Sequence, residues 1–196
     1  RGFQVYSEVC SSCHSLSLLS YRNLRAIGFS EDQVKKIAAE VEIEDGPNDE
    51  GEMFERAGRP GDRFKAPFAN SQAARASNGG ALPPDLSLMT KARKNGANYL
   101  HALLTGFTDP PADKEIAEGM SYNVYYPGGQ IAMAPPLSED VVEYADKTKA
   151  TVPQMAHDVT TFLAWAAEPE LEERKRLMQS LSARTLSQSV SLTGTK

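Results

Sequence analysis

Cysteine is scarce in this 196-residue sequence, and both copies fall within four consecutive positions. Cys10 and Cys13 are too few and too close together to form the disulfide framework of a domain of this size. The residue that follows them, His14, is one of only three histidines in the chain. The lack of cysteine elsewhere therefore concentrates the thiol chemistry of the protein in the stretch CSSCH.

Long apolar runs and a net positive charge are also lacking. No window approaches the 18 apolar residues of a membrane-spanning helix. The 26 acidic residues outnumber the 21 basic ones, and the formal charge is -5. This balance argues against a nucleic-acid-binding protein, which normally presents a basic face. The chain opens on RGFQVY with no visible signal peptide, so we expect any leader to lie upstream or to have been removed.

The acidic residues are unevenly distributed along the chain. The stretch from Glu40 to Glu55 contains eight of them and no basic residue, so that removing these charges would change the formal charge from -5 to +3. Gly46, Pro47 and Gly51 predict that this stretch is a loop. A charge run of this kind is most often a solvated surface, and that interpretation stays open at this point.

Clear strand patterns are nearly absent, and the expected elements are helices and long loops. Apolar spacing predicts helices over residues 3–13, 30–44, 98–107 and 151–166. Ser30 and Gln33 form a capping box, and Pro153 suits the first turn of the last helix. Proline and glycine predict irregular structure over residues 56–90 and 108–137, apart from a short ribbon around 122–126. We therefore predict an all-α fold with long Pro/Gly-rich loops.

Cys-x-x-Cys-His is the attachment motif of c-type haem. Thiols three residues apart in a helical segment face the same side, so each can add to one vinyl group of a single porphyrin. The residue after the second cysteine can then direct its imidazole at the iron. The sequence thus predicts one covalent haem c, held by Cys10 and Cys13, with His14 as an axial ligand.

Three alternatives compete with haem at this motif. A thioredoxin-like redox pair would follow a strand in a βαβ unit, and no such pattern is present. A zinc site would need two more ligands at a second spacing, whereas His101 and His157 are isolated from each other. The third alternative is that both cysteines are simply buried.

The second axial position of such an iron can be taken by methionine or histidine, or left vacant. Met155 lies on the apolar stripe of the last predicted helix and is expected to be core. Met133, in IAMAPPL, lies in a loop stiffened by Pro135 and Pro136, which suits a weak thioether ligand. It is the favoured candidate, and Met120 is the alternative. Histidine–methionine ligation leaves no open position for a substrate, so we predict electron transfer rather than an enzyme acting alone.

Five stretches, in this order along the chain, are RGFQVYSEVCSSCHSL, DGPNDEGEMF, NGGALPPDLS, YYPGGQIAMAPPL and HDVTTFLAWAAEPELEERKR. Together they resemble the cytochrome c1 family, the haem subunits of the quinol:cytochrome c oxidoreductase (cytochrome bc1) complex. The resemblance implies a cytochrome c-like haem domain over residues 1–176, with 40–55 as an acidic insertion. Residues 177–196 form a polar tail where the family continues into a membrane-spanning helix, and we expect this tail to fray.

The resemblance also implies a set of site residues. The positions that match the haem site of the family are Cys10, Cys13, His14, Pro83, Pro84, Arg93, Tyr99 and Met133. Among them, Arg93 matches an arginine that pairs with a haem propionate, and Tyr99 matches a nearby hydrogen-bonding tyrosine. Pro83 and Pro84 match prolines that pack near the haem on the histidine side. The histidine and the methionine of the set match the axial ligands.

Partners and location follow from the same resemblance. The family accepts an electron from the Rieske iron–sulfur protein, shares its complex with cytochrome b, and passes the electron to a soluble or membrane-anchored cytochrome c. Acidic residues 40–55 would attract the lysines that surround the haem edge of such a cytochrome. Haem c is attached outside the cytoplasm, which implies the periplasmic side of a bacterial inner membrane or the intermembrane-space side in mitochondria.

Overall fold

The computed structural model describes residues 1–181 of the chain. Its helices are α1 (Gly2–Glu8), α2 (Glu31–Ala39), α3 (Ser71–Ser77), α4 (Met89–Ala92), α5 (Gly96–Thr105) and α6 (Val152–Ala166), with two short 3₁₀ helices, η1 (Cys10–Ser12) and η2 (Tyr21–Ile27). Its strands are β1 (Glu42–Asp45), β2 (Phe54–Ala57), β3 (Ser121–Tyr122) and β4 (Gln130–Ile131). The described chain is therefore mainly helix and loop with little sheet, which agrees with the predicted helical class and is compatible with a cytochrome c-like fold.

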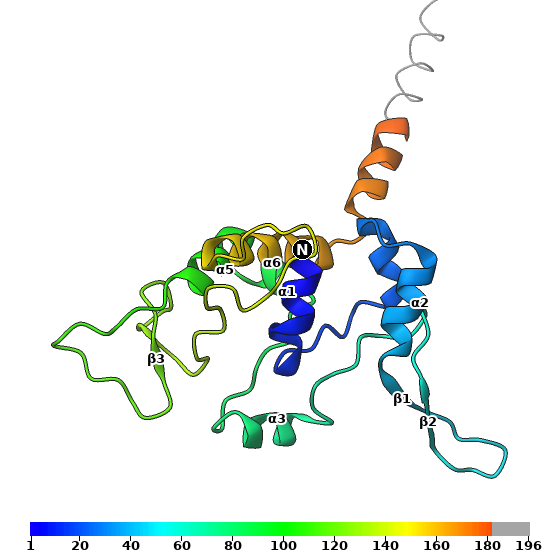
Figure 1. Ribbon diagram of the computed structural model, residues 1–196, viewed down its shortest axis with the longest axis horizontal. Coiled ribbons are helices and arrows are strands. Elements are labelled where there is room, and N and C mark those ends of the chain that lie inside the picture. The colour runs from blue at the N-terminus through cyan, green and yellow to red at the C-terminus, as the bar shows by residue number, and fades with distance from the viewer. Residues whose placement is uncertain (182–196) are drawn as a thin grey trace, which may run out of the picture.

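Helices α1, α5 and α6 pack together at the centre of the molecule (Figure 1). The apolar face predicted for α6 is buried, and Met155, Val159 and Leu163 each expose 4% of their surface or less. Removing side chains of this size from water contributes about 1.5–3 kcal/mol each. The helix begins where expected, because the Thr151 hydroxyl accepts a hydrogen bond from the Gln154 N–H at 3.3 Å.

Helix α1 approaches α6 very closely, and a glycine makes this possible. A Cβ at Gly2 would lie 2.1 Å from the Asp158 carbonyl oxygen and 2.7 Å from the Cβ of Phe162. The next residue, Phe3, meets the Phe162 ring edge-on with the ring centroids 5.8 Å apart. Tyr6, one turn further, is 2% exposed. The short helix that leads into the two cysteines is thus fixed on the core of the domain.

Residues 40–55 form a hairpin, so the prediction of a simple loop is wrong for its two arms. Strands β1 and β2 pair antiparallel, with Glu42 opposite Ala57 and Asp45 opposite Phe54. The sequence alternates acidic with apolar residues up to Asp45, which is the period of a strand, and the glycines and proline after it form only the turn. Arg56 forms ion pairs with Asp45, at the end of the facing strand, and with Asp62, in the segment that follows the hairpin.

Other helix boundaries differ from the prediction for local reasons. The capping box is confirmed, since Ser30 Oγ accepts from the Gln33 N–H at 3.2 Å and the Gln33 side chain accepts from the Ser30 N–H at 2.8 Å. Helix α2 nevertheless ends at Ala39, because the following residues turn into β1. The short ribbon predicted around residues 122–126 is confirmed only in part, because β3 ends at Tyr122 and the following residues form the turn that leads to β4. The elements η2, α3 and α4 were not predicted.

The chain beyond α6 continues as a helical segment over residues 171–181, which projects from the body of the molecule (orange in Figure 1). Residues 177–181 are therefore helical, and the expectation that they fray is wrong. The remainder of the predicted polar tail, residues 182–196, lies outside the described residues. None of the helices within residues 1–181 is long and apolar enough to cross a membrane.

The close contact between α1 and α6 makes Gly2 a sensitive position. Gly2→Ala places a methyl group against the Asp158 carbonyl, and we expect it to lower the free energy of unfolding by about 1–3 kcal/mol. Denaturant unfolding followed by circular dichroism measures this loss. Gly61→Ala is the control, because a Cβ there meets no atom within 4 Å. Equal stability of the two variants would contradict the packing described here.

Candidate haem site

The CSSCH stretch leaves the α-helical path before its first cysteine. Helix α1 ends at Glu8, and Cys10–Ser12 form the 3₁₀ helix η1. The N–H groups of Cys13 and His14 both donate to the Cys10 carbonyl, at 3.2 and 2.9 Å. Residues three apart eclipse each other in a 3₁₀ turn, so the two thiols lie on the same side of the chain. The predicted continuous helix to residue 13 is wrong. The 3₁₀ turn aligns the two thiols more closely than an α-helix would, which suits the predicted attachment of both to one porphyrin.

The thiols are free, and the environment of Cys10 does not suit a reactive redox pair. Both cysteines are unbridged and half-buried. Burial, with a smaller contribution from Cys13, raises the pKa of the Cys10 thiol to about 12. Redox-active Cys-x-x-Cys motifs depend on a lowered thiol pKa. Together with the absence of a βαβ unit from residues 1–181, this argues against the thioredoxin-like alternative.

The imidazole of His14 is held in one tautomer by a backbone carbonyl. Its Nδ1 lies 2.8 Å from the carbonyl oxygen of Pro84. A carbonyl oxygen can only accept, so Nδ1 must carry the proton and Nε2 keeps a free lone pair. Burial lowers the pKa of His14, although the Pro84 carbonyl opposes this. The ring is therefore neutral and oriented, which is the form in which histidine binds iron or another metal.

Asp85 fastens the Pro84 segment to the histidine segment. Its carboxylate accepts hydrogen bonds from the Ser15 hydroxyl at 2.7 Å, the Ser17 N–H at 2.8 Å and the Ser87 N–H at 2.8 Å. Burial opposes ionisation, but these hydrogen bonds outweigh it and hold the pKa of Asp85 at about 2. The sequence analysis missed this residue. The signal for it is an aspartate followed two residues later by serine, since aspartate often accepts from the backbone two residues on.

The two predicted prolines lie near Cys13 and His14, and the Pro84 carbonyl is the one that contacts the histidine ring. A hollow beside Cys13 is lined by Pro83 and Pro84 and by residues 66–74, which include the start of α3. Figure 1 shows α3 below the end of α1. Tyr6 supports the same region from the core, because its hydroxyl donates to the His14 carbonyl at 3.2 Å. The structure thus brings four of the predicted site residues together on one side.

Both candidate methionines belong to the β3–β4 hairpin. Ser121 pairs with Ile131, so Met120, just before β3, lies at the same end of the hairpin as Met133, which follows β4 by two residues. Met133 is half-buried. Met120 lines a second hollow with Leu104 and Pro135, and no residue of segment 10–14 lines that hollow.

The remaining methionines and histidines are poorer candidates for an axial ligand. Met155 is 0% exposed and belongs to the core cluster, as expected. Met53 is exposed in the acidic hairpin. His157 is exposed on α6. Within residues 1–181, no three His, Cys, Asp or Glu side chains are grouped so that they could hold a metal ion, which argues against the zinc alternative.

Arg93 and Tyr99 lie on either side of the turn between α4 and α5. Arg93 is exposed, and its guanidinium donates to the Ala92 carbonyl at 3.1 Å. Tyr99 lies in the first turns of α5 and packs partly against the core. Their roles at a haem propionate stay predictions. Only one N–H donor of the guanidinium contacts the Ala92 carbonyl, so its other donors are able to bind a carboxylate.

Comparisons with known proteins agree with the resemblance noted in the sequence. A profile of the Cytochrome C1 family matches residues 1–195. A mitochondrial cytochrome c1 heme protein of Arabidopsis thaliana is 61% identical over 175 residues, which are 89% of this chain and 57% of that protein. The cytochrome c1 of Rhodospirillum rubrum is 51% identical over 193 residues, covering 90% of this chain and 71% of the relative.

A third relative is named as part of an assembly. The cytochrome b-c1 complex catalytic subunit of Candida albicans is 52% identical over 177 residues, covering 90% of this chain and 62% of that protein. The chain spans little more than half the length of the Arabidopsis relative, at 57%. What the relatives do as whole proteins therefore enters below only as a proposal.

Acid titration tests the anchoring role of Asp85. Its pKa is about 2 in the folded protein and about 3.9 in an unfolded chain. The stabilisation is therefore complete above about pH 4 and is lost as the pH falls towards about 2. We expect Asp85→Asn to lower stability by about 1–3 kcal/mol near neutral pH and to reduce the further loss on acidification. Denaturant unfolding at a series of pH values measures both effects.

The control for this titration is Asp113→Asn, which changes the same charge at an exposed position. We expect it to leave both the stability and its pH dependence close to those of the unmodified protein. An Asp85→Asn protein with the same acid profile as the control would show that Asp85 does not hold the histidine segment.

Proposed function

The chain belongs to the Cytochrome C1 family, and we propose that it is an electron-transfer subunit that carries one haem c through thioether bonds to Cys10 and Cys13. The observation that carries the proposal is the hydrogen bond between His14 Nδ1 and the Pro84 carbonyl, 2.8 Å long. It leaves Nε2 as a ligand next to two free thiols that share one side of a 3₁₀ turn. The names of the relatives as heme proteins support the same group.

We propose Met133 as the second axial ligand. It is half-buried, and the hairpin that carries it is also the one that carries Met120. We prefer it to Met120, which lines a separate hollow, because Pro135 and Pro136 stiffen the loop that carries Met133. A bound haem c would supply one-electron exchange between ferrous and ferric iron. With a histidine and a methionine in both axial positions, no site remains for a substrate, and the chain would be no enzyme by itself.

The other residues of the site would bind and orient the group. Pro83 and Pro84 provide apolar contacts on the histidine side of the hollow beside Cys13. Arg93 would pair with a propionate through guanidinium donors that its backbone contact leaves over. Tyr99 would donate a hydrogen bond nearby. In the same proposal, the hairpin of residues 40–55 and the Pro/Gly-rich loops are insertions in a cytochrome c-like core.

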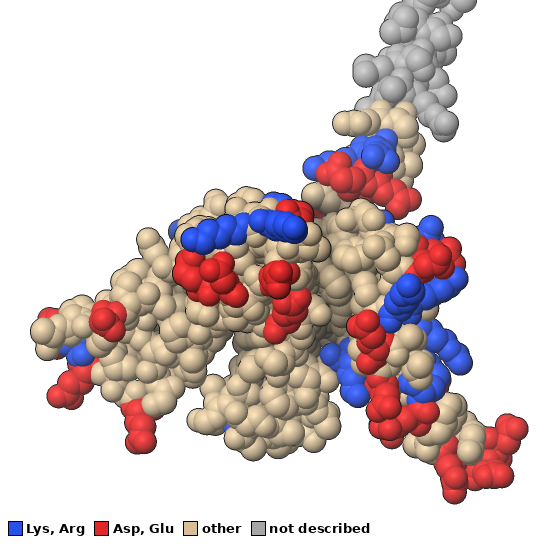
Figure 2. All heavy atoms as spheres, in the orientation of Figure 1, with Lys and Arg blue, Asp and Glu red and all other residues tan. Residues whose placement is uncertain are grey.

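The acidic hairpin would guide a basic electron acceptor to the protein. Its turn carries the exposed acids Asp49, Glu50 and Glu52, whereas Asp45, at the end of β1, is paired with Arg56. Figure 2 shows acidic side chains gathered at the tip of this hairpin and basic ones alongside its base. Glu40, Glu42, Glu44 and Glu55 are exposed as well, so the negative field comes from the arms of the hairpin as well as from its tip. Such a field speeds encounter with a lysine-rich partner without requiring tight binding.

We propose the partners and the location that the family implies. The electron would come from the Rieske iron–sulfur protein, within a complex that also contains cytochrome b, and would leave to a soluble or membrane-anchored cytochrome c. The Candida albicans relative is named as a subunit of the cytochrome b-c1 complex, which supports this assembly. The domain would lie on the periplasmic side of a bacterial inner membrane or on the corresponding face of the mitochondrial one.

Replacing the proposed ligand tests the function directly. We expect Met133→Leu to abolish the methionine-to-iron charge-transfer band of the ferric protein, to lower the reduction potential, and to permit rapid carbon monoxide binding when reduced. Absorption spectroscopy and redox titration measure these changes. Met120→Leu is the matched control and should leave all three unchanged. The reverse pattern would assign the ligand to Met120, and unmodified protein that binds carbon monoxide rapidly would contradict electron transfer by a closed iron.

The steering role of the hairpin is tested by neutralising its tip. We expect Asp49→Asn, Glu50→Gln and Glu52→Gln together to slow electron transfer to a basic cytochrome c by up to about tenfold at low ionic strength. The difference should shrink at about 0.15 M salt, because the Debye length falls to about 8 Å. Stopped-flow kinetics at several salt concentrations measures the rate.

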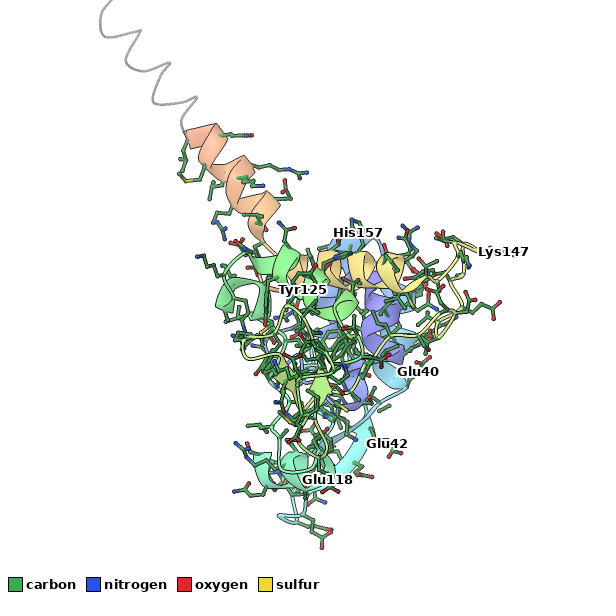
Figure 3. The ribbon with its side chains drawn as sticks, turned by 90° about the vertical axis from the view of Figure 1, so that its left-hand side faces the viewer. Glu40, Glu42, Glu118, Tyr125, Lys147 and His157 are labelled. Atoms are coloured by element: carbon green, nitrogen blue, oxygen red, sulfur yellow. The ribbon has the colours of Figure 1, made fainter. Side chains whose placement is uncertain are left out.

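The control for this experiment removes the same number of charges elsewhere. Asp109→Asn, Asp113→Asn and Glu118→Gln change three exposed acids on the segment before β3. Glu118 is labelled in Figure 3, and Figure 1 shows β3 at the opposite end of the molecule from β1 and β2. Equal slowing by both triple variants would show that net charge, and not the hairpin, accounts for the effect.

A further inference from the structure

Asn123 is fully buried, with 0% of its surface exposed, yet it has no part in the ligand set described above. Its Nδ2 donates to the Leu103 carbonyl at 2.7 Å, and its Oδ1 accepts from the Tyr125 N–H at 3.0 Å. A buried amide is costly unless its polar atoms are paired. Both ends of this side chain are therefore used: the nitrogen reaches α5, and the oxygen accepts from the turn that follows Asn123 itself.

The contact with Leu103 joins the β3–β4 hairpin to the end of α5. The last carbonyls of a helix have no partner within the helix, and Leu103 lies two residues before the end of α5 at Thr105. The backbones are joined at the same place, because the Val124 N–H donates to the Gly106 carbonyl at 3.0 Å. Phe107 and Asn123 form an isolated β-bridge. The hairpin is thus joined to the end of α5 in two ways, by the Asn123 side chain and by this backbone bridge, to which the Val124–Gly106 hydrogen bond belongs.

Gly106 shows how tightly the two segments fit. A Cβ at this residue would lie 2.4 Å from the Tyr125 ring and 3.1 Å from Oδ1 of Asn123. The residue is buried, with no room for a side chain. The joint between α5 and the hairpin is therefore close-packed as well as hydrogen-bonded.

The joint determines where the candidate axial methionines lie. Helix α5 packs along α6 and is part of the core. Asn123 immediately follows β3, and its N–H donates to the Gly129 carbonyl at 3.0 Å, next to the start of β4. Met133 follows β4 by two residues. A shift of the hairpin relative to α5 would carry this methionine with it.

We propose that Asn123 is a positioning residue, which locks the β3–β4 hairpin to the end of α5 and thereby holds the distal methionine in place for the iron. The inference rests on the proposed histidine–methionine ligation. Its physical basis is the weakness of a thioether as an iron ligand, which requires the protein to hold the sulfur in position.

The test is Asn123→Ala in the haem-containing protein. The methionine-to-iron band is followed as the pH is raised. We expect the pH at which it disappears to be about one unit lower in the variant, which corresponds to a tenfold weaker hold on the ligand. The amide hydrogens of Val124 and Tyr125 should exchange with solvent at least about tenfold faster. Spectroscopic pH titration and hydrogen exchange measure the two effects. Asn123→Ser keeps a hydroxyl in the joint, so both measured values should lie between those of the unmodified protein and those of Asn123→Ala. This variant supplies the measurement if the alanine variant does not accumulate.

Ser30→Ala is the matched control for general destabilisation. It removes the N-cap of α2, a contact also worth about 1 kcal/mol, and Ser30 is exposed at the start of that helix. We expect its band to disappear at the same pH as in the unmodified protein. If Asn123→Ala behaves like this control in both measurements, Asn123 is not a positioning residue. A missing band in unmodified protein would instead contradict the ligation itself, and hydrogen exchange would still test the joint.

Discussion

The hydrogen bond from His14 to the Pro84 carbonyl is the contact on which the candidate site depends. It joins two segments 70 residues apart in the chain and decides which ring nitrogen keeps a lone pair. Without it, the histidine after the second cysteine could present either nitrogen. With it, the ring is oriented, and burial favours its neutral form. The carboxylate of Asp85 and the hydroxyl of Tyr6 hold the backbone on either side of this bond.

Different contacts support the histidine side and the proposed methionine side of the site, and both sets of contacts rest on the same helical core. The histidine side is fixed by hydrogen bonds between two loops and by α1, which Gly2 allows to lie against α6. In our proposal, the methionine side would be fixed through the β3–β4 hairpin, which Asn123 joins to α5. Helices α1, α5 and α6 connect both sides. A site held rigidly from two directions suits outer-sphere electron transfer, because the ligands need not move when the charge on the iron changes.

The sequence predicted the parts of this structure that depend on neighbouring residues. The capping box of α2 and the apolar face of α6 are short-range patterns, and both are confirmed. The CSSCH motif is also a short-range pattern, and its role at a haem stays a prediction. The partner of the histidine is a backbone carbonyl, which no side-chain pattern reveals. Asp85 and Asn123 acquire their importance from segments far away in the chain. The β1–β2 hairpin was not predicted, because the glycines and proline of its turn indicate a loop and the alternation of acidic and apolar residues covers only the first strand.

The most direct test of the central claim is the protonation of the His14 ring in the reduced, haem-containing protein. Nuclear magnetic resonance of protein labelled with ¹⁵N at histidine reports each ring nitrogen separately. The account predicts a slowly exchanging proton on Nδ1, close in space to Pro84, and no proton on Nε2 at any pH where the protein is folded. A proton on Nε2, or a ring that titrates freely near the ordinary histidine pKa, would contradict it.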